Sequence, residues 1–368
     1  MDETFKNMLR KHGIINYDHE VLPTISASII HKINKKENGQ IIESFIMKQM
    51  QLSEMGIEAD RKAAEENKDT AGTQGYVSRK ERALTEYGIM EKCSDEVNIL
   101  KAFDGQETPD GKWFYILCEF WGEDLYKKTL GKPVAFEHIA KWATQLIKIL
   151  KYCEKKGIFH GDLKPQNILI NDHNIVKLID FGISKEFSQS TYLREAGTVS
   201  KISGLTKNYM APEYFRSVEE QSKGKKKENV VIINKIDVYA FGMCLYQWIT
   251  SKGFDPLMKE MGEKVVGIPQ HEQWLQKNIL NLKVDNQEPE TIQRFIDIMH
   301  YCLKTNPKER KSFEELDGLI KGFNSYYATT IQALPHAEEI KEEPKIEGVI
   351  LKKTNGNFYN LFLKIKLP

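Results

Sequence analysis

The feature that most constrains this chain is a polar loop followed at once by an apolar stretch near the middle of the sequence. Residues 160–170 read HGDLKPQNILI, and Asp180-Phe181-Gly182 follows thirteen residues after Asn167. Between these two segments, residues 168–179 alternate as short strands around a turn at Asn171–Asn174.

Three further motifs follow in the second half of the chain. They are Ala211-Pro212-Glu213, the run DVYAFG at 237–242, and the run CLKTNPKER at 302–310. In order and spacing, the five motifs resemble those of the protein-kinase superfamily, over roughly residues 20 to 322. The resemblance implies an α+β, bilobal fold, with a small β-rich N-lobe and a larger helical C-lobe.

The resemblance also implies a chemistry, which is phosphoryl transfer from ATP with Mg²⁺. Asp162 would accept or orient the proton of the attacking hydroxyl, and Lys164 would reach the transferring phosphoryl group. A Lys at that point resembles the serine/threonine branch of the family. Asn167 and Asp180 would supply hard oxygen ligands to Mg²⁺, and Thr206 would tie the substrate-binding loop to Asp162. A single Asp or Asn could instead be a turn residue.

The lysine that contacts the α- and β-phosphates in this family corresponds to Lys48, in the run FIMK at 45–48. A solubilising lysine at a strand edge is the alternative interpretation. Its helix partner would be Glu86, with Glu96 as the rival. We favour Glu86, because Glu96 would leave no residues for the fourth strand of the small lobe.

The strand predicted over Trp113–Phe120 resembles the one that runs into the hinge between the lobes. By this resemblance Cys118 occupies the gatekeeper position, Glu119 and Trp121 offer backbone groups to adenine, and Leu169 forms the floor of the adenine pocket. As isolated features these would be ordinary core residues. Three more residues are expected to support the fold: Glu213 paired with Arg310, and Asp237 anchoring the catalytic loop.

The sequence departs from the family at three places. Where a glycine-rich loop should cover the phosphates, residues 22–30 read LPTISASII, which is stiffer at its β-branched positions. Ile46 stands where the family usually has Ala, so it should narrow the nucleotide pocket. Gly161 replaces an Arg that normally meets a phosphate on the activation loop, so we expect phosphorylation of 183–210 not to be the main switch.

Periodicity and turn signals divide the chain further. Residues 1–20 read as an irregular or short helical lead-in, 21–120 as the N-lobe, 121–325 as the C-lobe and 326–368 as a tail with a possible β-hairpin around Asn355-Gly356. Strands are expected around Asn38-Gly39, at 98–103 and at 113–120. Helices are expected at 79–93, from 139 onward, and at 236–250, 271–281 and 290–304. Insertions are expected at 52–80 and 216–235.

Composition excludes several function classes. The net charge of +1 gives no global attraction to nucleic acid or to an anionic membrane. No apolar run approaches the roughly 20 residues that span a bilayer, and no signal peptide is visible. The five scattered cysteines indicate reduced thiols in the cytoplasm, with the nucleus as the alternative. The basic run 223–227 is either a docking patch for an acidic partner or a solvated loop, which we favour.

The sequence thus predicts a serine/threonine kinase that acts on protein substrates. The divergent residues over the nucleotide site leave a second hypothesis open, a pseudokinase that serves as a binding scaffold. A phosphotransferase for small molecules is disfavoured, because Ala211-Pro212-Glu213 and Thr206 mark a loop that binds protein substrates.

Overall fold

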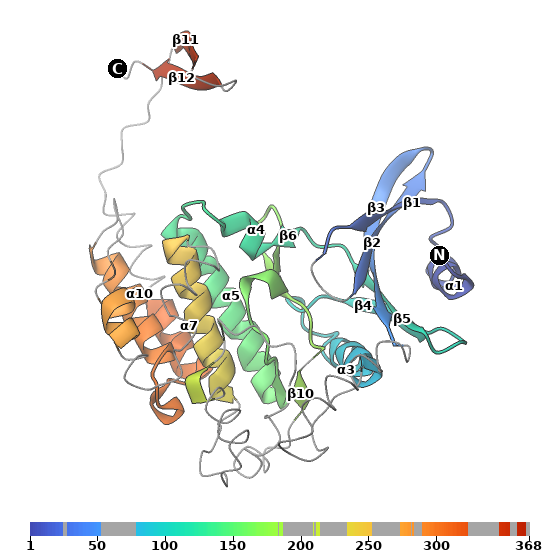
Figure 1. Cartoon of the computed structure of the whole chain (residues 1–368), viewed down its shortest axis with the longest axis horizontal. Helices are drawn as coiled ribbons and strands as arrows, with labels where there is room; N and C mark the ends of the chain where they lie inside the picture. Colours follow the sequence, from blue (N-terminus) through green and yellow to red (C-terminus); the bar gives the residue numbers. More distant parts are fainter. Residues whose placement is uncertain are drawn as a thin grey trace, which may run out of the picture. The chain divides into compact units, whose positions relative to one another are not determined.

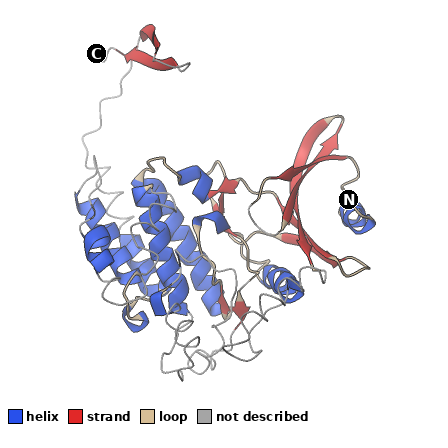
Figure 2. Cartoon of the chain, in the orientation of Figure 1, coloured by secondary structure: helices blue, strands red, loops and turns tan. Residues whose placement is uncertain are grey.

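The computed structural model describes most of the chain between residue 1 and residue 322, and two strands near the C-terminus. The described residues are 1–24, 28–52, 79–182, 184–186, 209, 211–213, 234–251, 273–280, 282, 289–322, 346–353 and 359–365. The chain divides into two compact units, Met1–Phe323 and Asn324–Pro368. In the first unit, strands gather in a small lobe and helices in a larger one (Figure 2). This arrangement confirms the expected α+β, bilobal fold.

The small lobe is built on an antiparallel five-stranded sheet with strand order β1-β2-β3-β5-β4 (Figure 1). Its strands are β1 (Tyr17–Leu22), β2 (Ile29–Glu37), β3 (Gln40–Gln51), β4 (Ala102–Glu107) and β5 (Trp113–Glu119). The hairpin predicted at Asn38-Gly39 joins β2 to β3. Both turn residues have positive φ, 49° and 79°, which is the conformation that an Asn-Gly hairpin turn uses.

The first twenty residues differ from the expected lead-in, because they belong to the small lobe. Helix α1 (Glu3–Lys11) is followed by β1, which pairs with β2 along its whole length. Phe5, Met8 and Leu9 of α1 are fully buried against the sheet. The sheet therefore has a helix on its outer face, away from the large lobe (Figure 1).

The fourth strand is also displaced from its expected place at 98–103, since β4 begins at Ala102 and ends at Glu107. Residues 104–112, which carry Pro109 and Gly111, have the composition of a polar turn. The structure instead buries the carboxylate of Asp104 on the sheet, where Lys11 Nζ donates to it at 2.8 Å. A distant cation thus makes a buried Asp compatible with a strand.

The predicted helix at 79–93 is confirmed as α3 (Arg79–Lys92), which lies beside the sheet (Figure 1). It packs Ala83, Glu86, Ile89 and Met90 inward. Its place beside β3, β4 and β5 brings a buried acidic side chain close to the strand that carries Lys48.

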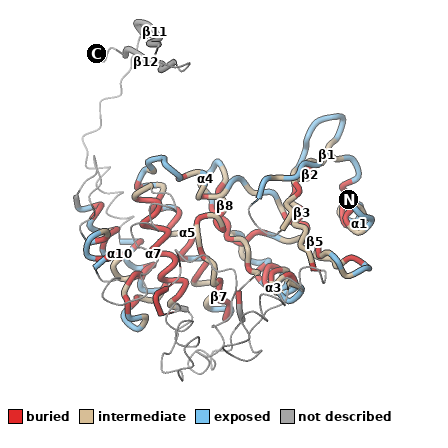
Figure 3. The backbone as a smooth tube through the Cα atoms, in the orientation of Figure 1, coloured by how far each residue is buried: buried red, intermediate tan, exposed pale blue. Residues whose placement is uncertain are grey.

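The large lobe is a packed group of helices with two small sheets at its edge. Its elements are β6 (Glu123–Asp124), α4 (Leu125–Thr129), α5 (Phe136–Lys155), β7 (Ile158–Phe159), β8 (Ile168–Ile170), β9 (Val176–Leu178), β10 (Lys185–Glu186), α7 (Asn234–Thr250) and α10 (Pro289–Cys302). Three predicted helices appear as α5, α7 and α10, and residues 273–280 form a shorter helix ending in π-helical Gln276–Leu280. The central α5 and α7 are largely buried (Figure 3), with Trp142 packed edge-on against Trp248.

The second unit contains an antiparallel pair, β11 (Ile346–Lys353) and β12 (Tyr359–Ile365). The hairpin expected near the C-terminus is therefore present, although its turn at Asn355-Gly356 lies outside the described residues. No helix in the described part of the chain is long and apolar enough to cross a membrane.

Candidate active site

The loop between β7 and β8 holds three polar side chains in contact with one another. Lys164 Nζ donates to Asp162 Oδ2 at 2.5 Å. Asn167 Nδ2 donates to the backbone oxygen of Asp162 at 2.8 Å and to its Oδ2 at 3.2 Å. The side chains of Asp162 and Lys164 keep 11% and 17% of their surface exposed. A small molecule could therefore reach this carboxylate and ammonium together.

The backbone of this loop is fixed by Asp237, at the start of α7. Its two carboxylate oxygens accept hydrogen bonds from the backbone N–H groups of His160 (2.9 Å) and Gly161 (3.0 Å). Gly161 has φ +83°, a left-handed conformation that strains any residue with a side chain. The glycine thus allows the turn that presents the next residue, Asp162, and Asp237 has the supporting geometry we expected of it.

The Asp-Phe-Gly segment lies directly beside the loop. The N–H of Ile179 donates to the carbonyl of Asn167 at 3.0 Å. Phe181 is fully buried and packs edge-on against the ring of His160, 4.9 Å between centroids. Asp180 has φ +68°, which is a strained conformation for a non-glycine residue and is held only where its surroundings enforce it.

One ammonium group joins the small lobe to this segment. Lys48 Nζ on β3 lies 2.6 and 2.7 Å from the two carboxylate oxygens of Glu86 on α3, and 3.3 Å from Asp180 Oδ1. Glu96, the rival partner, instead accepts a bond from the backbone N–H of Asn98. The structure therefore brings together Lys48, Glu86 and Asp180, as the sequence suggested.

The charges in this trio shift one another's pKa values. Burial alone would lower the pKa of Lys48, but the charges of Asp180 and Glu86 outweigh it and raise that pKa. The charge of Lys48 holds the pKa of Asp180 below its usual value, against the effect of burial. Burial raises the pKa of Glu86, and Lys48 opposes that rise without cancelling it. At neutral pH the site therefore holds an ammonium beside an ionised Asp180.

The donor set fits a small hard cation completed by phosphate oxygens. Asp180 is ionised, and its side chain is 40% exposed. The amide nitrogen of Asn167 is bonded to Asp162, so the amide oxygen faces the other way. Among the described residues no three His, Cys, Asp or Glu side chains gather as a metal cluster. Two protein ligands with the rest supplied by substrate is the arrangement that Mg²⁺ commonly has in phosphoryl-transfer sites.

The residues expected around adenine come from β3, β5 and β8. Ile46 on β3 is paired with Cys118 on β5, and Cys118 is almost fully buried. Burial raises the pKa of the Cys118 thiol, so this side chain stays neutral and apolar in character. Leu169 on β8 is only partly buried, so part of its surface is open to contact.

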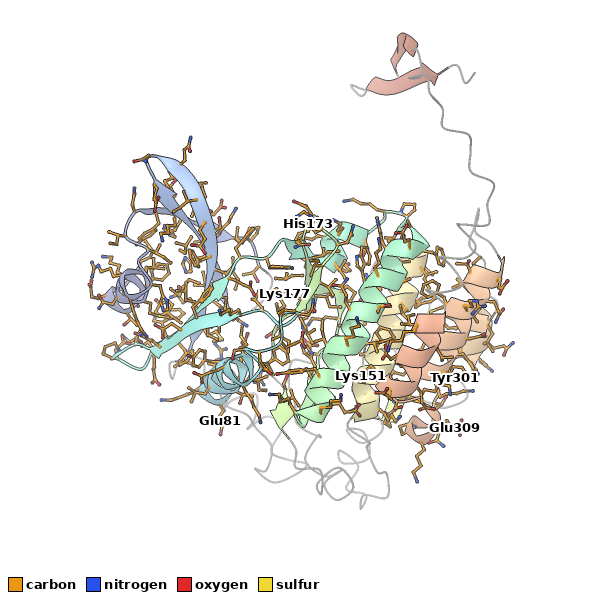
Figure 4. All side chains as sticks on the ribbon, turned by 180° about the vertical axis from the view of Figure 1, so that it is seen from behind. Glu81, Lys151, His173, Lys177, Tyr301 and Glu309 are labelled. Atoms are coloured by element: carbon orange, nitrogen blue, oxygen red, sulfur yellow. The ribbon has the colours of Figure 1, made fainter. Side chains whose placement is uncertain are left out.

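The hinge residue Glu119 has less to offer a base than the sequence indicated. Its backbone N–H already donates to the carbonyl of Lys101 at 3.0 Å, which leaves its carbonyl oxygen. Its carboxylate accepts from the N–H of Lys101 and from the ammonium of Lys177. Lys177 lies between the lobes (Figure 4) and 4.3 Å from the ring centre of Trp121. Sequence reasoning missed Lys177, since nothing local in the sequence marks a contact across 58 positions.

A second ion pair supports the large lobe. Arg310 donates to both oxygens of Glu213, at 2.6 and 2.7 Å, and its remaining donors reach the carbonyls of Lys304 and Lys235. The pair predicted from the sequence is therefore in contact, far from Lys48.

Several expected features lie outside the described residues. They are Thr206, residues 25–27 of the divergent loop over the phosphates, most of the two insertions with the basic run 223–227, and most of 183–210. Residues 79–80 and 234–235, the ends of the expected insertions, belong to α3 and α7. Thr206 thus remains a prediction.

Comparison with known proteins agrees with this geometry. A family model described as the protein kinase domain matches residues 33–318. Calcium-dependent protein kinase 27 of Arabidopsis thaliana is 28% identical over 287 residues, which are 74% of this chain and 52% of that protein. A probable serine/threonine-protein kinase of Clostridium acetobutylicum is 34% identical over 157 residues, 42% of this chain and 21% of that protein.

A third relative is mitogen-activated protein kinase kinase kinase 12 of Rattus norvegicus, 29% identical over 207 residues, 55% of this chain and 20% of that protein. The chain therefore spans between about a fifth and about half of the length of these relatives.

Proposed function

Because this chain belongs to the protein kinase family, we propose that it is an active serine/threonine kinase, which transfers the terminal phosphoryl group of ATP to hydroxyl groups of other proteins. The observation that carries the proposal is that two clusters of polar side chains, one around Lys48 and one around Asp162, are connected by a backbone hydrogen bond. Lys48 lies between Glu86 and Asp180, and Asp180 follows a residue bonded to Asn167 of the Asp162–Lys164–Asn167 loop.

Each side chain has a role that its contacts support. Lys48 is positively charged and would bind the α- and β-phosphate oxygens of ATP, while Glu86 holds its ammonium in place. The oxygens of Asp180 and Asn167 would hold Mg²⁺, which when bound neutralises charge on the phosphates. Positioning and charge neutralisation account for most of the catalysis in this kind of reaction.

The catalytic loop would act on the other substrate. Asp162 would accept or orient the proton of the attacking hydroxyl, and hydrogen bonds from Asn167 hold its carboxylate in place. Lys164, bonded to the same carboxylate, can turn toward the transferring phosphoryl group and offset its negative charge. Its position two residues after Asp162 supports the serine/threonine assignment, as does the name of the Clostridium acetobutylicum relative. Five buried free cysteines support a reducing compartment such as the cytoplasm.

A second candidate is a pseudokinase that binds partners without phosphoryl transfer. It is favoured by Ile46 at the adenine pocket and by the loss of glycine at 22–30, both on the nucleotide side of the site. The catalytic loop and Asp180 carry no such substitutions beyond Gly161.

Phosphotransfer from labelled ATP to generic acceptor proteins tests the proposal, with Mg²⁺ and Mn²⁺ supplied separately. Asp162→Ala should lower the rate roughly a hundred- to ten-thousand-fold, because proton transfer loses its acceptor. Asp172→Ala removes an exposed carboxylate from the β8–β9 turn and should leave the rate unchanged. Equal background in wild type and Asp162→Ala with both metals would overturn the proposal in favour of the pseudokinase.

A further inference from the structure

Helix α1 and strand β1 precede residue 33, where the match to the protein kinase domain begins. The outer face of the sheet is apolar and carries Ile33, Phe45, Met47, Tyr115 and Leu117. Phe5, Met8 and Leu9 of α1 cover this face and are fully buried there. Because side chains alternate along a strand, Met47 faces α1 while its neighbour Lys48 faces the candidate site. The helix therefore packs directly behind the strand that carries Lys48.

Both ends of α1 are tied to the sheet by polar contacts. At the first end, Asp2 caps the helix by accepting from the N–H of Phe5, and its other oxygen accepts from the hydroxyl of Tyr115 on β5 at 2.8 Å. At the last end, Lys11 Nζ lies 2.8 Å and His12 Nε2 3.3 Å from Asp104 Oδ2 on β4. The position of α1 on the sheet is thus set at two points as well as by packing.

The Asp104 contact is more than a surface ion pair, because the Asp104 side chain is only 8% exposed. Burial raises its pKa, but the hydrogen bonds and charge of Lys11, with His12 and the N–H of Gly105, bring the pKa below the usual value. The carboxylate is therefore ionised and depends on the end of α1 for its compensating charge.

Gly105, which follows Asp104 on β4, connects the sheet to α3. Gly105 faces the opposite side of the sheet from Asp104, and the ring of Tyr87 on α3 lies against it. A Cβ at this position would stand 2.6 Å from Tyr87 Cδ2, so only glycine permits the approach. Tyr87 also packs near Phe114, 6.1 Å between ring centroids. Its neighbour in sequence is Glu86, the partner of Lys48.

We propose that α1 positions the Lys48–Glu86 pair, with Asp104 as the positioning residue that transmits the placement of α1 through Gly105 and Tyr87 to α3. Neither Lys11 nor Asp104 belongs to the candidate site, since their contact lies between the end of α1 and β4. The inference rests on the proposed function only for its effect on the rate, since the placement of α3 can be measured without catalysis.

Charge reversal at Lys11 tests the connection in the full chain. Lys11→Glu places a second carboxylate beside the buried Asp104 and should drive the end of α1 from β4. Arg10→Glu makes the same charge change one residue earlier, where the partner is the exposed Glu3 within α1 itself. Lys11→Arg keeps the positive charge and should behave as wild type. Lys11→Glu combined with Asp104→Asn removes the like-charge contact and should recover much of the loss.

Two measurements are compared across these variants. Hydrogen exchange of the α3 amides, residues 79–92, should speed up in Lys11→Glu but not in Arg10→Glu. The specificity constant kcat/KM for ATP should fall roughly three- to tenfold in Lys11→Glu alone, because coupling along such a path is modest. A uniform rise in exchange over the whole small lobe would indicate plain destabilisation and would overturn the inference, as would unchanged α3 exchange in Lys11→Glu. If the wild type transfers no phosphate, the proposed function fails while the exchange data still decide the inference.

Discussion

Two ion pairs in the described part of the chain, Arg310–Glu213 and Lys48–Glu86, differ in the number of acids that each cation serves. In the large lobe, Arg310 meets one carboxylate, Glu213, through two parallel hydrogen bonds, and neither side chain is more than 4% exposed. At the boundary of the small lobe, Lys48 lies between Glu86 and Asp180, and 17% of its side chain is exposed. A cation that is fully bonded to one partner is suited to a structural role. A partly exposed cation shared by two acids can take up a third anion, such as a phosphate.

The largest effect expected from this comparison is on stability. Arg310→Met leaves Glu213 as an uncompensated buried charge and should lower the free energy of unfolding by about 3–5 kcal/mol. Urea denaturation followed by circular dichroism measures the loss. Arg294→Met removes an exposed pair with Glu290 on α10 and should change the free energy by less than about 1 kcal/mol. Similar losses in the two variants would contradict a special role for the buried pair.

The corresponding change at Lys48 should lower activity more than stability. Lys48→Met removes the ammonium that we propose binds the phosphates and should lower the rate of phosphoryl transfer roughly a hundredfold, as the loss of one strong electrostatic contact does. Its effect on unfolding should stay below that of Arg310→Met, because burial already raises the pKa of Glu86 and this acid can take up a proton. A steady-state assay beside urea denaturation separates the two effects.

Acid titration of this variant gives an independent measurement. The charge of Lys48 lowers the pKa of Asp180, so in the wild type Asp180 stays ionised to a lower pH. Without Lys48 that pKa rises, and binding of Mg²⁺ with nucleotide should be lost at a higher pH than in the wild type. Lys141→Met removes an exposed ion pair on α5. It should leave unchanged the pH at which binding of Mg²⁺ with nucleotide is lost. An identical shift in both variants would mean that Lys48 does not act on Asp180.

The smallest effect concerns the proposed nucleotide site, on the side of β3 that carries Lys48. Ile46→Ala should raise the affinity for ATP about tenfold, because it removes excess volume opposite Cys118. Calorimetric titration with ATP analogues measures the change, and Ile42→Ala, at an exposed position of the same strand, serves as the control. Unchanged affinity in Ile46→Ala would show that this side chain does not contact the base.

Much of the fold followed from local signals in the sequence. Asn38-Gly39 predicted the β2–β3 hairpin because few other residue pairs adopt positive φ at both turn positions. The helical periodicity of residues 79–93 predicted α3 within one residue of its end. The site residues followed from a resemblance whose motifs are themselves local.

The missed features depend on contacts between distant segments. The strand expected at 98–103 stops short of Asp104, whose place in β4 depends on Lys11, 93 positions away. The Glu119–Lys177 ion pair was missed for the same reason, because its two residues are 58 positions apart in the sequence. For α1 a signal did exist: Asp2 at the N-cap is followed by Phe5, Met8 and Leu9 at helical spacing. Nine residues are too few for that pattern to show which surface the helix would cover.

The cover that α1 forms has a practical consequence for anyone who trims this protein. A recombinant fragment cut where the family match begins, at residue 33, would start inside β2 and lack both α1 and β1. Its sheet would present Phe45, Met47 and Leu117 to water, beside the newly unpaired edge of β2. An apolar patch next to an open strand edge favours self-association. Such a fragment would tend to aggregate during purification even though every catalytic motif is present in it.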